Sequence, residues 1–174
     1  MKSFNLFYLL FFFINYGCGV YSFTGASISP EIKTISIETY FNNSPLGPSN
    51  MSVLFTEKLK DYFQKNTSLI LVDSEGDLQL EGSIDDFSTS PVAPTAEGGK
   101  NAQYFTGLTR LNVRVTSSYL NTQEDQFNYD NKSFSFYKDF DQNSQELSAN
   151  EQEFLEEIFD QIILDIFNSS VANW

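Results

Sequence analysis

The sequence predicts an α+β domain, with two helices packed on one face of a mostly antiparallel sheet of four to five strands. Stretches 34–38 and 108–119 alternate polar and apolar residues, as a strand with one buried face does. Stretches 51–66 and 148–171 carry apolar residues at helical spacing. The resulting order of strand, helix, three or four strands and helix fits one α+β layer.

The first 17 residues have the features of a leader peptide. Lys2 supplies a positive start, residues 6–14 are apolar without a break, and Gly17 is a small residue before Cys18. A run of nine apolar residues is too short to cross a bilayer, because a transmembrane helix needs about 20. We therefore expect 1–17 to be a lipoprotein signal peptide. The alternative is an ordinary secretory leader, since Asn15 stands where a lipobox usually has leucine.

Lipidation would explain the cysteine usage of the chain. Cys18 is the only cysteine, and a lone thiol in an exported protein has no disulfide partner. Two or more acyl chains on one residue hold a protein to a membrane where a single chain does not. Residues 18–30 are small or turn-forming and predict a lipidated tether. Residues 31–174 are expected to form a single domain.

Composition narrows the classes of function. The chain has 10 Lys and Arg residues against 23 Asp and Glu residues, a net charge of −13, which disfavours binding to nucleic acid. It has no histidine, which excludes histidine-based nucleophilic triads. With Cys18 acylated, thiolate chemistry and zinc-type sites are excluded as well. We expect no enzyme activity, no metal and no cofactor beyond the acyl and diacylglycerol groups on Cys18.

The N-terminal half of the domain is expected to contain one helix between strands. Residues 34–38 predict the first strand, and 41–48, rich in Asn, Pro and Gly, predict a turn. Ser49 or Asn50 can cap a helix that ends near Asn66. Its apolar positions are Met51, Leu54, Phe55, Leu59, Tyr62 and Phe63.

Two strands and a long loop are expected next. Residues 69–72 form a short apolar strand, and 73–77 turn the chain directly into the next strand. That strand begins at Leu78, and its apolar phase slips before Phe87, which predicts a bulge at Asp85 and Asp86. Residues 88–106 predict a long irregular loop, a kind of segment that often contacts a partner.

The C-terminal half is expected to be a hairpin followed by a helix. Residues 108–119 form the clearest strand, with Arg110 and Arg114 together on its solvent face. A turn at 121–126 leads to an antiparallel strand at 127–140. Residues 148–151 match a capping box and predict the start of the last helix. The apolar stripe of this helix is Phe154, Leu155, Ile158, Phe159, Ile162, Ile163, Ile166, Phe167 and Val171.

Several segments, taken in their order and spacing, resemble the lipopolysaccharide-assembly lipoproteins (the LptE family) of the Bacteroidetes type. The segments are Cys-Gly-Val-Tyr-Ser-Phe-Thr-Gly-Ala at 18–26, Lys-Thr-Ile-Ser-Ile at 33–37, Phe-Thr-Glu-Lys-Leu-Lys-Asp at 55–61, Gly-Asp-Leu-Gln-Leu-Glu-Gly at 76–82, Ser-Pro-Val-Ala at 90–93, Asp-Ile-Phe-Asn at 165–168 and Val-Ala-Asn-Trp at 171–174. The resemblance covers essentially the whole chain after the leader.

The resemblance implies a location and a role. Such proteins are held by their acylated cysteine at the periplasmic face of the outer membrane of Gram-negative bacteria. They plug the lumen of a large β-barrel partner, LptD, help it assemble, and take part in delivering lipopolysaccharide to the outer leaflet. The residue after the cysteine, Gly19, is not the aspartate that retains lipoproteins in the inner membrane, and no acidic run for surface export follows Cys18. We therefore expect the periplasmic side of the outer membrane.

The candidate site residues are few. Arg110 and Arg114 are the candidate lipopolysaccharide contacts, because anionic phosphates are bound by arginine or lysine. They lie roughly 13 Å apart along one strand, too far to hold one phosphate jointly. The alternative is that both are solvated arginines paired with nearby acids. The candidate contacts to a protein partner are Tyr104, Phe105 and Tyr137.

Two other functions remain open from the sequence. The first is a stand-alone periplasmic lipoprotein chaperone or ligand-binding module. The second is a carboxylate-dependent hydrolase using Asp85 and Asp86 or Glu156 and Glu157, but consecutive residues on a strand or helix point in different directions. Residues 73–77 look like half of a calcium loop, although the glycine is one position early and a hairpin turn is the favoured interpretation.

Overall fold

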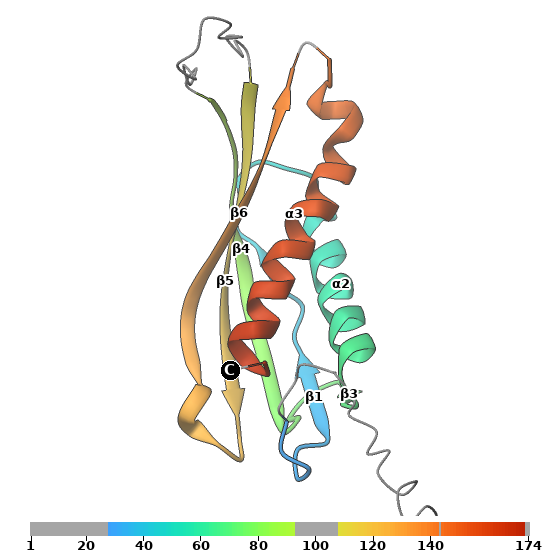
Figure 1. Ribbon diagram of the computed structural model, residues 1–174, viewed down its shortest axis with the longest axis vertical. Coiled ribbons are helices and arrows are strands. Elements are labelled where there is room, and N and C mark those ends of the chain that lie inside the picture. The colour runs from blue at the N-terminus through green and yellow to red at the C-terminus, as the bar shows by residue number, and fades with distance from the viewer. Residues whose placement is uncertain (1–27, 93–107, 143, 173–174) are drawn as a thin grey trace, which may run out of the picture.

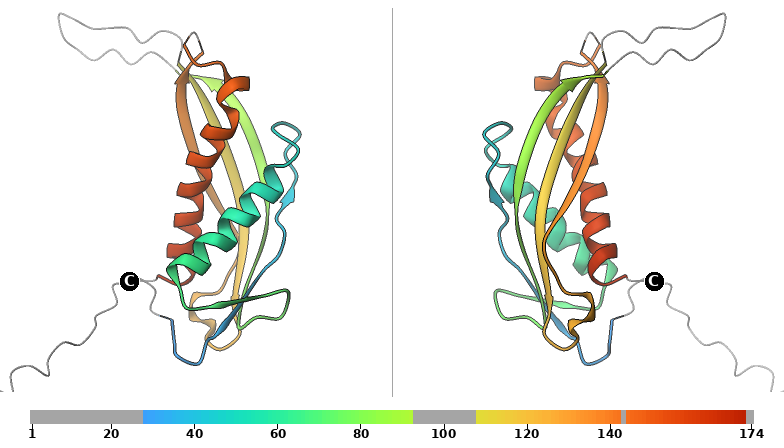
Figure 2. Two further views of the ribbon diagram at one scale, coloured as in Figure 1. Left: turned by 90° about the vertical axis from the view of Figure 1, so that its right-hand side faces the viewer. Right: turned by 90° about the vertical axis from the view of Figure 1, so that its left-hand side faces the viewer.

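The computed structural model describes residues 28–92, 108–142 and 144–172, which form two helices on one face of a six-stranded sheet (Figure 1). The strands are β1 (Thr34–Ile37), β2 (Phe41–Asn42), β3 (Ile70–Val72), β4 (Leu78–Pro91), β5 (Leu108–Asn121) and β6 (Tyr129–Asp141). The helices are α2 (Met51–Asn66) and α3 (Leu147–Ser170), and a 3₁₀ turn, η2 (Asp125–Phe127), precedes β6. The predicted α+β class, with both helices on one face, is confirmed (Figure 2).

The sheet is mostly antiparallel, as predicted, but it also contains a parallel part. Its order is β3-β1-β4-β5-β6, with β2 pairing separately with β4. The β4-β5 and β5-β6 pairs are antiparallel, as expected for the C-terminal half. In contrast, β1 is parallel to both β3 and β4, and β2 is parallel to β4. The expected four to five strands become six because the segment read as a turn contains the two-residue β2.

The parallel part arises from residues 73–77, which do not form the predicted hairpin. Strands β3 and β4 lie on opposite sides of β1, so this segment crosses over β1 to connect them. A Cβ atom on Gly76 would lie only 2.5 Å from the backbone nitrogen of Ser36, so the crossing requires glycine. The Asp77 carboxylate then accepts hydrogen bonds from the backbone N–H groups of Lys33 (2.9 Å) and Thr34 (3.0 Å). The turn residues are thus used for a crossover.

Helix α2 begins and ends where the sequence predicts. It starts after Asn50, although the Asn50 side chain makes no capping hydrogen bond, and it ends at Asn66. Helix α3 starts at Leu147, with Glu146 at the cap position, so the predicted capping box is wrong. Ser148 lies inside the first turn, and its hydroxyl donates to the Glu146 carboxylate (2.8 Å). The whole predicted apolar stripe of α3 is buried.

Aromatic contacts join the two helices and the sheet into one core. The ring of Phe55 on α2 packs edge-on against Phe159 on α3, with centroids 5.0 Å apart, and against Tyr40 at the same distance. Near the other end of α2, Phe63 packs against Phe167 at 5.1 Å. Helix α3 covers β5 and β6, while α2 covers the β1-β2-β3 side (Figures 1 and 2). These rings fix the tilt of both helices over one sheet face.

The long strands differ from expectation mainly in length. The bulge in β4 lies between Ile84 and Asp86, where the sequence predicts it. Strand β4 then continues to Pro91, so residues 88–91 are strand rather than loop, and residues 93–107 lie outside the described part. Strand β6 begins at Tyr129 because η2 occupies the preceding residues.

The described chain begins near the C-terminal end of α3. Ile28 and Ser29 line one groove of about 410 Å³ together with Ser170 and Val171. This is the lower end of the molecule in Figure 1, and the last residues of β4 and the first residues of β5 lie at the opposite end. None of the described helices combines the length and apolar character needed to cross a bilayer.

Candidate functional site

The face of the sheet opposite the helices is the candidate functional surface. Consecutive side chains of a strand point to opposite faces, so the burial of one set of β5 residues by the helices leaves the alternate set on the open face. The strand register places polar side chains from three strands next to one another on this face. They are Glu81, Ser83, Asp86, Ser88, Arg110, Asn112, Arg114, Thr116, Ser118, Ser133, Ser135, Tyr137 and Asp139.

Arg110 forms the most ordered contact group on this face. Its Nε and Nη2 donate to the two carboxylate oxygens of Asp139 at 2.7 and 2.8 Å. The guanidinium carbon lies 3.6 Å from the centroid of the Tyr137 ring, within the range of a cation–π contact. The hydrogen bonds from Arg110 hold the pKa of the Asp139 carboxyl below its usual value. A bidentate, stacked arginine has little freedom left for another anion.

Arg114 lies on the same face, four residues after Arg110, but in a different environment. It is exposed, and it makes no ion pair or hydrogen bond with any residue that the structure describes. Asp85, extruded at the bulge, accepts hydrogen bonds from the hydroxyls of Thr116 and Ser83. Burial raises the pKa of Asp85, but these hydrogen bonds and the nearby Arg114 charge outweigh burial and lower the pKa. Arg114 therefore keeps its donors available to a ligand.

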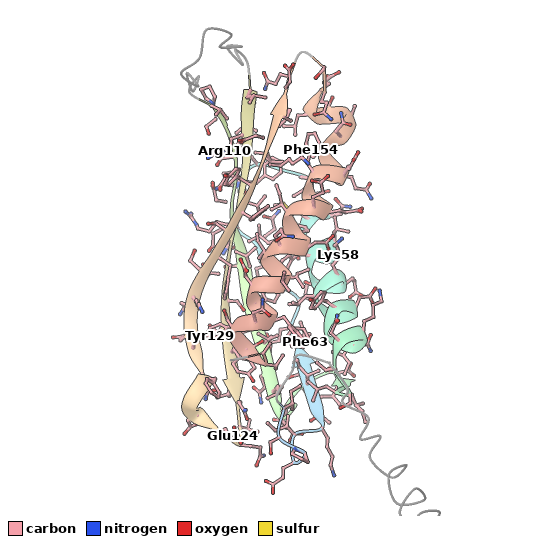
Figure 3. The ribbon with its side chains drawn as sticks, in the orientation of Figure 1. Lys58, Phe63, Arg110, Glu124, Tyr129 and Phe154 are labelled. Atoms are coloured by element: carbon pink, nitrogen blue, oxygen red, sulfur yellow. The ribbon has the colours of Figure 1, made fainter. Side chains whose placement is uncertain are left out.

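A groove of about 510 Å³ occupies the lower end of the open face. It lies between the 73–77 crossover and the start of β6, where Tyr129 is found (Figure 3). Its lining includes the carboxylates of Glu38, Glu75, Glu81 and Asp130 and no lysine or arginine. Among the described residues, no three carboxylate or thiol side chains come close enough together to hold a metal ion. The lower half of the face is thus acidic, and the two arginines lie in the upper half.

Three tyrosine hydroxyls approach the core beneath this face without forming a reactive site. The Tyr40 hydroxyl is 2.6 Å from the Ser117 hydroxyl, and burial raises the pKa of Tyr40. Burial also raises the pKa of Tyr129, and it raises that of Tyr119 to about 12. All three phenols are therefore neutral at physiological pH. Their placement indicates a structural role.

The structure brings some of the predicted site residues together. Arg110 and Tyr137 are in contact, and Arg114 lies on the same face. Cys18, Tyr104 and Phe105 lie outside the described residues. Sequence analysis missed Asp139 as the partner of Arg110. The hairpin register pairs these two positions, but the sequence leaves the length of the turn after β5 ambiguous.

The comparisons with known proteins concern nearly the whole described chain. A family model described as "LptE: Lipopolysaccharide-assembly" matches residues 32–170. A search of curated proteins finds no match to the sequence.

Solved structures share the fold at low sequence identity. A hypothetical protein of Chlamydia trachomatis is similar with a TM-score of 0.53 and 10% identity, covering 82% of this chain and 99% of that one. A protein of Xanthomonas campestris has a TM-score of 0.51 and 10% identity, with 81% and 88% covered. An uncharacterised lipoprotein B of Nitrosomonas europaea has a TM-score of 0.49 and 10% identity, with 78% and 79% covered. The first two likenesses show the fold alone.

Proposed function

The chain belongs to the lipopolysaccharide-assembly (LptE) family, and from this premise we propose that it plugs and helps assemble an LptD-like β-barrel of the outer membrane. In this role it takes part in moving lipopolysaccharide to the outer leaflet. The observation that carries the proposal is the family match over residues 32–170, which spans both helices and every strand. The family is one of lipoproteins that work with LptD, and we propose no catalysed reaction.

The open sheet face supports a role as a fitted component. A plug must present a polar surface, because the lumen of a large outer-membrane barrel is itself polar. The open face carries hydroxyl, amide and charged side chains over β4, β5 and β6, and the apolar stripes of both helices face the sheet. The domain therefore has a wide polar surface to place against such a lumen.

We further propose that Cys18 carries the lipid that anchors this domain to the periplasmic face of the outer membrane. Ile28 lies ten residues after Cys18, and a fully extended chain of that length reaches roughly 35 Å. The described chain begins at the lower end of the molecule and Arg110 lies toward the upper end (Figure 3). We therefore propose that the lower end faces the membrane anchor and that the upper end points away from it. This orientation would leave the upper end free to enter the barrel.

Contact with lipopolysaccharide phosphate is proposed at Arg110 and Arg114, with Arg114 as the more available donor. Replacing Arg114 with Gln should weaken the binding of purified lipopolysaccharide by the domain about fivefold or more, since one charge-assisted contact is lost. Lys65→Gln is the matched control, because Lys65 is an exposed cation on α2. Equal binding by Arg114→Gln and the control would remove Arg114 from the proposed contact.

Co-purification tests the proposed function. The chain, tagged at its C-terminus, is expressed together with the LptD-like barrel of the same organism and extracted in mild detergent. We expect a complex with one copy of each protein by native mass spectrometry. Recovery of the lipoprotein alone, with the folded barrel present in the same membranes, would contradict the proposal and favour the stand-alone chaperone.

A further inference from the structure

Strand β6 has one edge that no strand in the described part of the chain covers. It is the last strand of the sheet, and among the described strands it pairs only with β5. Strand β5 alternates between buried and less buried residues along its length, but in β6 seven of the eight residues from Asp130 to Tyr137 are exposed. Helix α3 therefore shields β6 only locally, at residues such as Phe134 and Phe140.

The backbone groups at this edge can be assigned residue by residue. The Asn121 N–H faces β6, because it donates to the Asn128 side chain (2.6 Å). The backbone C=O of Leu108 points toward β4, because it accepts a hydrogen bond from the Val92 N–H (2.9 Å). Since the backbone groups of successive strand residues point to alternate sides, the odd-numbered residues of β5 are those bonded to β6.

The register then fixes which residues of β6 are unpaired. Val115, Val113 and Leu111 lie opposite Phe134, Phe136 and Lys138. The even-numbered residues of β6 therefore bond to β5, and the odd-numbered residues direct their N–H and C=O groups away from it. The outward set is Ser133, Ser135, Tyr137 and Asp139.

The side chains along this edge leave it open. Edge strands usually discourage pairing with another strand by projecting lysine into the solvent beside the edge. Here Lys132 donates to the Ser169 hydroxyl (3.0 Å) and Lys138 pairs with Glu157, so both lysines are held against α3. Ser133 and Ser135 are small, so another backbone can approach closely. The strand contains no proline or glycine.

Two aromatic side chains beside the edge offer an anchor for a partner. Phe136 and Tyr137 are 38% and 46% exposed, and their rings lie 5.8 Å apart and nearly parallel. Tyr137 is held in place by the Arg110 guanidinium, which Asp139 fixes in turn. Exposed, preorganised tyrosine beside arginine is typical of the residues that dominate binding energy in protein interfaces.

From these observations we propose that β6 binds an extended segment of the barrel protein by strand addition along residues 133–139. This inference rests on the proposed function, because it takes the barrel as partner. The segment must be a part of the barrel protein other than its barrel strands, since the strands of a closed barrel have no free edge to offer. Main-chain hydrogen bonds to the outward set supply the affinity, and a side chain packed on Phe136 and Tyr137 sets the register.

The test removes one outward N–H without removing a side-chain function. Ser135→Pro lacks that donor, and proline is tolerated on an edge strand where the N–H faces solvent. Ser135→Ala is the matched control, because it keeps the N–H. Each variant is co-expressed with the LptD-like barrel, and thermal unfolding by circular dichroism checks its fold. We expect Ser135→Pro to reduce the recovered barrel about tenfold or more, and Ser135→Ala to leave it unchanged.

A second readout does not depend on the proline variant. A photocrosslinking amino acid in place of Tyr137 should react with one extended segment of the barrel protein, identified by mass spectrometry. Full barrel recovery with folded Ser135→Pro, or crosslinks at 137 only between two copies of this chain, would overturn the strand-addition proposal while leaving the plug role intact. Failure of the unmodified chain to hold the barrel would instead overturn the plug role and this inference together.

Discussion

Single residues decide where backbone segments can approach one another in this fold. A Cβ atom on Gly82 would lie 2.2 Å from the Thr116 carbonyl oxygen and 2.5 Å from the Tyr40 ring. The Tyr40 ring occupies this space and is fully buried there. Glycine in the middle of a long strand is otherwise unfavourable, so its presence here is explained by the close approach of Tyr40.

Gly82→Ala should therefore destabilise the domain. Two hard contacts cannot both relax without moving β5 or Tyr40, and overpacking of this kind costs roughly 1–3 kcal/mol of unfolding free energy. Urea denaturation measures the change. Ser90→Ala, on an exposed part of the same strand, should change the unfolding free energy by less than about 0.5 kcal/mol. Equal stability of the two variants would show that Tyr40 does not need this space.

Asp77 gives the crossover a pH dependence whose direction can be predicted. Hydrogen bonds from the Lys33 backbone, and then from the Thr34 side chain and backbone, lower the pKa of its carboxyl. A lowered pKa in the folded state means that these bonds stabilise the fold fully above the unfolded pKa of about 3.9. The stabilisation is lost as the pH falls from there through the folded pKa.

Carbon NMR titration of the Asp77 carboxyl in the full chain measures this directly. We expect its midpoint to lie below that of an unstructured aspartate. The difference in stability between the unmodified chain and Asp77→Asn should accordingly shrink as the pH is lowered below about 4. A midpoint at or above the unstructured value would contradict the role of Asp77 in fixing the crossover.

At the scale of elements, α3 carries much of the packing between the helices and the sheet. Phe159 is fully buried and packs on Phe55 of α2. Phe159→Ala should cost about 3–5 kcal/mol of unfolding free energy, because the cavity left by the ring cannot collapse between two helices and a sheet. Gln161→Ala, on the exposed side of α3, is the control and should be nearly neutral. Similar denaturation midpoints for both variants would contradict this account of the core.

Periodicity predicted the elements better than local sequence signals predicted their connections. The apolar stripes placed α2, α3 and the buried face of β5 correctly, because burial against a neighbour enforces the spacing. Residues 73–77 have hairpin composition, yet they cross over β1, since the pairing partner of β3 is chosen by tertiary contacts. The motif at 148–151 suggested a helix start, but helical structure already begins at Leu147.

The candidate site was predictable only in part for the same reason. Alternation along β5 correctly put Arg110 and Arg114 on one face. The β5-β6 register decides that Arg110 is bound by Asp139, whereas Arg114 makes no hydrogen bond or ion pair with a described residue. The free edge of β6 depends on the strand order of the whole sheet, which no local pattern in the sequence specifies.

At the scale of the whole molecule, the proposed anchor and the folded domain are separable. Cys18→Ala should release the protein from washed membranes of cells lacking the barrel, because no lipid can then be attached. The thermal unfolding midpoint of the domain should not change, since Cys18 lies outside residues 32–170 that define the family match. Alkaline extraction followed by immunoblotting checks the release. Undiminished membrane attachment of this variant would overturn the proposed lipid anchor.

The central claim is that this domain works inside a barrel. It is tested most directly by determining the structure of the detergent-purified complex of the full chain with its LptD-like partner by electron cryo-microscopy. We predict one domain within the barrel lumen, with the open sheet face and the free edge of β6 in contact with the partner. A complex in which the domain lies outside the lumen, or a barrel that is folded and closed without it, would contradict the claim.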